Sequence, residues 1–470
     1  MFWSIVQVIG GQGITFLTLA FLAVFLGPAD FGVLGMAIVW LSFIQVFSEM
    51  GFGAALIQRR EVDSGHFSTI YFVNVAAGIL LTLTGIALSW ACALFFNTPG
   101  VQPIMAVLSF GFIISSFSLT QLAIAQKDLR FRDLAIRDIS ASLCGGSAGI
   151  ILAWFDFGVW SLVAQSLITS AMGAVLLWYM SAWRPRAEEF SFQCVKELWP
   201  YSSKMFAFAV LKYFTMNTDK LVIGYFLGPV ALGLYTFAYR IIVQPTSAFV
   251  GAIGAYLFPK ISMIQDDPAE IRSSYLFVSK ATNTVITPLL IMVMILSPMI
   301  IAPVFGEKWE PAVPLIQILA VFAITIPWIS HVGQVMKALN RPGWLLSWVI
   351  FVAALVAVSV WFGSSLGVEG ATFGLLAAYV IALPVNFWLL SKLIDAGFMD
   401  ILSTFIPSVF SAGLMGLALW LTLAYNKFAA AYAVSIGALL AVFLYFMVLM
   451  FIDRRFLVNF SKKLLRLEVT

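Results

Sequence analysis

The chain has 470 residues, of which 62% are hydrophobic and only 10% are charged, and its mean hydropathy is +1.00. A soluble protein of this length needs far more polar surface to cover its core, so this composition excludes an ordinary soluble globular protein. The net charge of +4 is too small to indicate nucleic-acid binding, and we expect no nucleic acid among the partners.

Apolar segments long enough to cross a bilayer recur from one end of the chain to the other. We therefore predict an all-α polytopic membrane protein. The predicted helices number about fourteen, at residues 4–26, 31–57, 68–96, 103–125, 137–155, 159–181, 201–226, 230–257, 280–304, 311–336, 344–362, 369–391, 404–425 and 431–452. Short turn-rich links separate many of them, for example at Gly27, Asn97 and Gly228.

The basic residues test this count through the positive-inside rule. With a cytoplasmic N-terminus, 20 of the 26 Lys and Arg residues fall in inner segments, and only Lys308 and Lys427 fall in outer loops. A wrong number of spans would scramble this bias, so both termini are predicted to be cytoplasmic. The two longest predicted loops, 182–200 and 258–279, are also cytoplasmic. In the second, Asp267 and Pro268 predict a capped helix start.

One segment of the chain occurs twice. FLGPADFGVLGMA at Phe25–Ala37 aligns with FLGPVALGLYTFA at Phe226–Ala238, at a constant offset of 201 residues. Six predicted spans separate the copies, so both halves run in the same direction through the bilayer. Parallel repeats of this kind relate two lobes by an axis along the membrane normal. We predict six-helix lobes at 1–196 and 197–395, followed by two helices and a basic tail at 396–470; the alternative is a chance match, because Gly-Pro turns suit any short link.

Charged residues gather in the hairpin formed by the seventh and eighth predicted spans. Counted from the turn at Gly228 at 1.5 Å per residue, Asp219 lies roughly 13 Å deep, Lys220 roughly 12 Å and Arg240 roughly 18 Å. Lys212 lies about 24 Å in, within the inner leaflet. Charges inside hydrocarbon are costly and usually face a bundle interior or a watered cavity.

Two interpretations of these charges are open. Asp219 could form an ion pair with Arg240 on the adjacent helix, which would hold the hairpin together. The positive charges of Lys220 and Lys212 would still remain, and an apolar residue would cost less there. The functional interpretation is a cationic lumen that attracts an anionic headgroup, preferably a phosphate or pyrophosphate. Lys204, at the cytoplasmic boundary, is expected to snorkel to the interface.

Other polar residues within the predicted spans are less informative. Glu49 and His331 are expected near the membrane interface. Amides could either line an aqueous path or join helices, as in Gln7, Gln12, Asn74, Gln121, Asn217, Gln244, Asn283 and Gln334. The three cysteines have no metal-ligand spacing, and the sequence has no nucleophile elbow or phosphate-binding glycine loop. We expect neither an enzyme nor a cofactor or metal site.

Several stretches together resemble the polysaccharide exporters of the multidrug/oligosaccharidyl-lipid/polysaccharide superfamily, and in particular the Wzx-type flippase branch with colanic-acid and teichuronic-acid exporters. These stretches are Phe25–Ala37, VDSGHFSTIYFVN at Val62–Asn74, LAIAQKDLRFRDLAIRD at Leu122–Asp138, FGVWSLVAQ at Phe157–Gln165, and NTDKLVIGYFLGPVALGLYTFAYR at Asn217–Arg240. With the span pattern they cover nearly the whole chain, although the last two spans diverge most.

The resemblance implies two lobes in the bacterial cytoplasmic membrane that open alternately to either side. They would move a polyprenyl-pyrophosphate-linked oligosaccharide to the outer leaflet, for exopolysaccharide or lipopolysaccharide assembly. Other membrane proteins of polysaccharide assembly are possible partners. The resemblance also implies a positively charged cavity, for which Lys212, Lys220 and Arg240 are the candidates, with Asp219 matching the acid of an NxDxLxIG-like stretch. The first lobe's spans hold fewer basic residues than this predicts. The alternative is a cation-coupled multidrug antiporter of the same superfamily, which should carry acids rather than lysines in its lumen.

Overall fold

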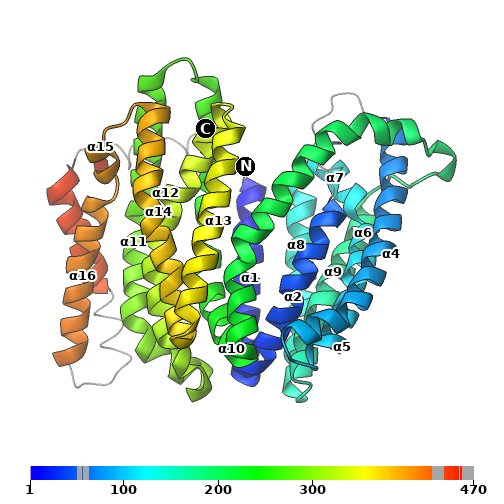
Figure 1. Cartoon of the computed structure of the whole chain (residues 1–470), viewed down its shortest axis with the longest axis horizontal. Helices are drawn as coiled ribbons and strands as arrows, with labels where there is room; N and C mark the ends of the chain where they lie inside the picture. The colour runs from blue at the N-terminus through cyan, green and yellow to red at the C-terminus, as the bar shows by residue number, and fades with distance from the viewer. Residues whose placement is uncertain (1, 50–55, 57–62, 426–438, 455, 458–470) are drawn as a thin grey trace. The chain divides into compact units, whose positions relative to one another are not determined.

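The computed structural model describes residues 2–49, 56, 63–425, 439–454 and 456–457, and these residues contain helices and turns but no β-strand (Figure 1). They divide into two compact units, Met1–Phe237 and Ala238–Thr470, and α10 (Phe192–Met263) runs from the first into the second. The predicted all-α polytopic membrane fold is therefore confirmed.

The first unit is a bundle in which α8 packs against both α1 and α9, while α4 packs against α2, α5 and α6. Its helices are α1 (Phe2–Phe25), α2 (Pro28–Glu49), α4 (Ser64–Phe95), α5 (Val101–Leu108), α6 (Phe110–Ser116), α7 (Leu119–Lys127), α8 (Phe131–Trp154), α9 (Val159–Met180), the short 3₁₀ helix η1 (Ala187–Glu189) and the first part of α10.

In the second unit α12 packs against α11 and α14, α14 packs against α13, and α16 packs against α11. Its helices are the end of α10, α11 (Pro268–Phe305), η2 (Glu307–Ala312), α12 (Val313–Ala338), α13 (Pro342–Ser364), α14 (Gly367–Ile394), α15 (Phe398–Leu402), α16 (Ile406–Tyr425) and the helical residues 439–454.

Ten helices within the described residues are long and apolar enough to cross a membrane, or eleven if the bent pair Val101–Ser116 and Leu119–Lys127 forms one span. The bend of 45° in that pair falls within the predicted span 103–125. The predicted spans 201–226 and 230–257 correspond to the two parts of α10 on either side of Gly228. The count of fourteen stays a prediction, because residues 50–55, 57–62 and 426–438 lie outside the described part of the chain.

Local sequence signals explain the helix ends. Asp267 caps α11 as predicted: its carboxylate accepts hydrogen bonds from the backbone N–H groups of Ala269 and Glu270, both at 3.0 Å, with Pro268 in the first turn. The Glu270 carboxylate accepts a hydrogen bond from Lys260 Nζ at 2.7 Å.

The two copies of the repeated segment cross each other within the first unit, in α2 and α10. A Cβ atom added to Gly32 would lie 1.7 Å from the carbonyl oxygen of Pro229, and one added to Gly233 would lie 1.7 Å from that of Pro28. Since Pro229 and Gly233 are the partners of Pro28 and Gly32 at the offset of 201, the contact is reciprocal, as at a two-fold interface. Only glycine lets the two backbones approach this closely.

A buried cluster joins the last two described helices to α11. It contains Ile291 and Leu296 of α11, Met415 and Leu419 of α16, and Tyr445 of the 439–454 helix, among others. This apolar contact holds the C-terminal helices against the second unit.

Within the same region, Tyr445 compensates for a proline. Pro288 has no backbone N–H, so the carbonyl of Thr284, four residues earlier, loses its helical donor. The Tyr445 hydroxyl donates to that carbonyl at 2.8 Å. This is the kind of side-chain replacement that lets proline remain inside a membrane-spanning helix.

Candidate functional site

The predicted charged hairpin is formed by α10, which turns at Gly228. Gly228 has φ +78° and ψ −173°, a conformation that side chains other than glycine rarely adopt. Pro229 follows it at the start of the second segment, where a missing N–H costs nothing. The FLGP sequence therefore reverses the chain, and Asp219 and Tyr235 come to lie opposite each other.

Asp219 is buried, with 4% of its surface exposed, whereas Lys220 and Arg240 are half-buried. Its Oδ2 accepts a hydrogen bond from the hydroxyl of Tyr235, which is fully buried in the second segment of the hairpin. Its Oδ1 is buried and has no hydrogen-bond partner among the described residues. A buried carboxylate requires several donors to be stable, and Tyr235 is the one donor that the described residues supply to Asp219.

Lys220 follows Asp219 but lies about 100° around the helix, so the two side chains have different surroundings. Its Nζ donates to the backbone carbonyl of Met216 at 2.8 Å, and its side chain is half-buried. One turn away, Asn217 Nδ2 donates to the carbonyl of Tyr213 at 3.0 Å, and the Tyr213 hydroxyl donates to the carbonyl of Val39 at 3.0 Å. The first two contacts lie within α10, and the Tyr213–Val39 hydrogen bond anchors this part of α10 on α2.

The other two predicted site residues, Lys212 and Arg240, lie on either side of Gly228 in α10. Lys212 lies in α10, and its side chain is outside the described part of the structure. Arg240 is half-buried, twelve residues beyond Gly228, and belongs to the second unit. The structure thus brings Asp219 together with Tyr235, a residue that the sequence argument missed because it considered only charged partners.

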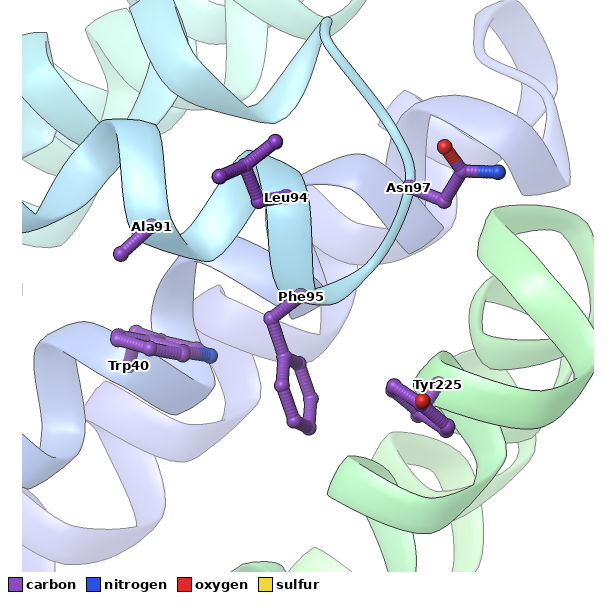
Figure 2. A pocket seen from close by; sticks show the side chains of 6 residues that line it. All are labelled: Trp40, Ala91, Leu94, Phe95, Asn97 and Tyr225. Carbon is purple, nitrogen blue, oxygen red and sulfur yellow. The ribbon is translucent and has the colours of Figure 1, made fainter.

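A cavity of about 650 Å³ lies in the first unit between α2, α4 and α10. Figure 2 shows the aromatic rings of Trp40, Phe95 and Tyr225 around it, with Asn97 on the turn after α4. Ala91 and Leu94 complete its lining. The sequence analysis did not identify this pocket, because its lining residues come from three helices that are far apart in the chain.

A polar cluster fixes the segment after α9 on the start of α4. Glu189 Oε2 accepts from the hydroxyls of Ser64 at 2.6 Å and Ser68 at 2.8 Å, and these hydrogen bonds hold the pKa of the Glu189 carboxyl below its usual value. Asp63 caps the same helix, accepting from the backbone N–H of His66 at 2.9 Å and contacting its Nδ1 at 2.6 Å. The side-chain contact with His66 likewise lowers the pKa of Asp63. The negative charges suit the helix N-terminus.

The second unit buries many neutral polar groups. His331, which we expected at the membrane interface, is fully buried, and its Nδ1 lies 3.2 Å from Ser279 Oγ on α11. The amides of Asn283 and Asn386 are buried without hydrogen-bond partners among the described residues. The depth of His331 in the membrane stays a prediction, but its side chain lies inside the second unit and not on its surface. Across the described ranges, no group of three or more His, Cys, Asp or Glu side chains is placed to hold a metal ion.

Comparisons with known proteins identify relatives of the chain. The family described as "Polysaccharide biosynthesis protein" matches residues 21–314. The chain is 25% identical to the lipopolysaccharide biosynthesis protein WzxC of Escherichia coli K12 over 393 residues, which cover 83% of this chain and 80% of WzxC. It is 29% identical to the teichuronic acid biosynthesis protein TuaB of Bacillus subtilis over 375 residues, which cover 77% of each. The resemblance stated from the sequence is confirmed.

Solved structures share the fold. The lipid II flippase MurJ in an inward closed conformation superposes with a TM-score of 0.77 at 12% identity, covering 96% of this chain and 99% of MurJ. An inward-facing multidrug transporter of the MATE family gives a TM-score of 0.64 at 16% identity, covering 83% of this chain and 98% of that one.

Proposed function

The chain belongs to the polysaccharide biosynthesis protein family that matches residues 21–314, and we propose that it is an alternating-access flippase for polyprenyl-pyrophosphate-linked oligosaccharides. It moves the repeat unit from the cytoplasmic to the outer leaflet for exopolysaccharide or lipopolysaccharide assembly. It is a transporter and performs no enzymatic chemistry. The observation that carries this proposal is the similarity to WzxC and TuaB over about three quarters of the chain or more.

In this proposal the chain forms six-helix lobes at 1–196 and 197–395, with two further helices and a basic tail at 396–470, and both termini are cytoplasmic. The sugar-pyrophosphate head crosses a polar path between the lobes while the lipid tail stays in the bilayer. Labelling of single cysteines placed near Gly228 and Asp267 tests the topology. Access to Asp267 from outside the cell would contradict it.

The charged hairpin supplies the chemistry. Lys212, Lys220 and Arg240 are proposed to attract the pyrophosphate, since cations in a low-dielectric path interact strongly with an anion. Asp219 is proposed to line the same path, with one oxygen held by Tyr235. A carboxylate in a cationic path would limit how tightly the anion is held, which favours release on the far side.

The test is a Lys220→Ala, Arg240→Ala double variant in a strain lacking the native gene. We expect loss of polysaccharide export and accumulation of the lipid-linked intermediate, with normal protein levels in the membrane. The charge-preserving Lys220→Arg, Arg240→Lys variant and the exposed-site control Lys392→Ala should both export. Normal polymer output from the double alanine variant would contradict the cationic path.

The same deletion strain separates the proposal from the multidrug antiporter. A flippase deletion causes the lipid-linked intermediate to accumulate without a change in drug sensitivity. Increased sensitivity to cationic drugs, with polysaccharide production unchanged, would support the antiporter instead.

A further inference from the structure

The aromatic pocket of the first unit has open ring faces. The rings of Trp40 and Phe95 meet at 62° with centroids 5.8 Å apart, and those of Phe95 and Tyr225 meet at 45° with centroids 4.8 Å apart. Edge-to-face and tilted pairs leave the faces of the rings available, whereas a parallel stack would cover them. Phe95 is 39% exposed and Tyr225 51% exposed, so these faces border the cavity rather than a packed core (Figure 2).

The pocket lies at the end of α4 and near the turn of α10, while Trp40 reaches it from the middle of α2. Phe95 is the last residue of α4, Asn97 follows in the turn with φ +48°, and Tyr225 lies three residues before the turn at Gly228. The left-handed conformation of Asn97 is one that asparagine tolerates. In the proposed topology both turns lie on the outer side of the membrane, and aromatic rings beside polar groups are typical of the boundary between hydrocarbon and headgroups.

The lining selects for a neutral ligand. None of the six lining residues carries a charge, so nothing in the lining would neutralise a phosphate. The aromatic faces carry partial negative charge and suit the weakly positive C–H groups of a ligand, while the Asn97 amide offers a donor and an acceptor. A hydrocarbon chain would use the rings and leave the amide without a role.

A pyranose ring combines these features, because one face presents C–H groups and its edge presents hydroxyls. A cavity of about 650 Å³ is within the range of small-ligand sites, roughly 300–1,000 Å³. We propose that the pocket lined by Trp40, Phe95, Asn97 and Tyr225 is a saccharide-binding subsite that holds neutral sugar rings of the lipid-linked cargo at the end of the first unit. This inference rests on the proposed function for the identity of the cargo.

The experiment uses the full-length protein in lipid nanodiscs and four probes of the same lipid length. These are citronellyl pyrophosphate and its conjugates with glucose, galactose and N-acetylglucosamine. We expect at least one conjugate to bind about 10-fold more tightly than the sugar-free probe, a gain equivalent to a few aromatic contacts. A Phe95→Leu, Tyr225→Leu variant should lose this gain and keep the affinity for citronellyl pyrophosphate.

Trp90→Leu is the matched control, since Trp90 is an aromatic residue of the same helix, 61% exposed and not in the pocket lining. It should keep the full gain. The proposal is overturned if no sugar increases the affinity, or if the gain survives in the double variant. An equal loss of affinity for the sugar-free probe would also overturn it and would assign the pocket to the isoprenoid chain.

A second measurement separates this proposal from the function on which it rests. If the protein binds none of the pyrophosphate probes, the proposed function fails. The saccharide-binding subsite is then tested separately with free methyl glycosides of the same three sugars. In saturation-transfer NMR, ring-proton signals that vanish in the double variant and persist in Trp90→Leu support the subsite. No transfer to any of the three glycosides overturns it.

Discussion

The reciprocal crossing of α2 and α10 makes a quantitative prediction for Gly32→Ala and Gly233→Ala. In each case the new Cβ would lie 1.7 Å from a proline carbonyl oxygen, whereas real Cβ atoms stay beyond 3.0 Å, so the backbones must separate by roughly 1.3 Å (3.0 − 1.7). The obstacle is backbone rather than a flexible side chain, so we expect a cost near the upper end of overpacking, about 3 kcal/mol. Alanine's better helix propensity returns about 0.5–1 kcal/mol.

The net loss of about 2 kcal/mol should lower the apparent Tm by about 4–8 °C in thermal unfolding of detergent-purified protein. Because both contacts belong to one crossing, the double variant should lose less than the sum of the single losses. The controls are Gly11→Ala and Gly413→Ala, where a Cβ meets nothing within 4 Å. Wild-type melting of either Gly32→Ala or Gly233→Ala, or simple additivity in the double variant, would refute the reciprocal packing.

Three further changes test single hydrogen bonds. Tyr235→Phe leaves the buried Asp219 without its donor and should lower stability by about 1–3 kcal/mol, measured by thermal unfolding; an unchanged Tm would contradict the hydrogen bond. Tyr445→Phe should lower the free energy of unfolding by about 1 kcal/mol in the native chain. The loss should be much smaller in a Pro288→Ala background, because the alanine restores the backbone donor to the Thr284 carbonyl. Equal losses in the two backgrounds of this double-mutant cycle would disprove the compensation. Glu189→Gln should speed tryptic cleavage of the segment after α9. Since the pKa of Glu189 is lowered in the folded state, its stabilisation is present above the ordinary value near 4.5 and is lost as the pH falls below it. In digestion with pepsin, which is active in that acidic range, the native chain and Glu189→Gln should therefore become equally susceptible, and a difference that persists there would contradict this.

Features that depend on chain-local chemistry could be predicted from the sequence. Asp267 and Pro268 predicted the start of α11, and the FLGP sequence predicted that the chain turns at Gly228. The offset of 201 residues correctly paired Gly32 with Gly233, although it did not reveal that the two copies touch. These features can be read from the sequence because caps and turns involve residues that are close together in the chain, and repeats involve residues that match in order.

Features that depend on which helix faces meet could not be predicted. In a soluble helix the apolar stripe marks the buried face, but a membrane helix is apolar all round, so periodicity gives no facial information. Depth counting gave His331 a position along its helix but no face, and the structure shows its side chain fully buried beside Ser279. The aromatic pocket was not predicted for the same reason, and Tyr235 was missed as the partner of Asp219 because only charged partners were considered.

The aromatic pocket and the crossing of α2 and α10 share helices, so a change at the crossing should affect the pocket. A Cβ on Gly224 would lie 2.7 Å from the ring of Phe96 and 3.2 Å from Leu232, so α10 is packed tightly on the end of α4 beside the crossing. Gly32 lies on α2, so a separation of the backbones there moves Trp40, which is carried by α2, relative to Phe95 and Tyr225, which are held together by this packing. We expect Gly32→Ala to weaken saccharide binding, although Gly32 is not in the pocket lining. Undiminished sugar binding in a Gly32→Ala protein with a lowered Tm would mean that the pocket walls move independently of the crossing.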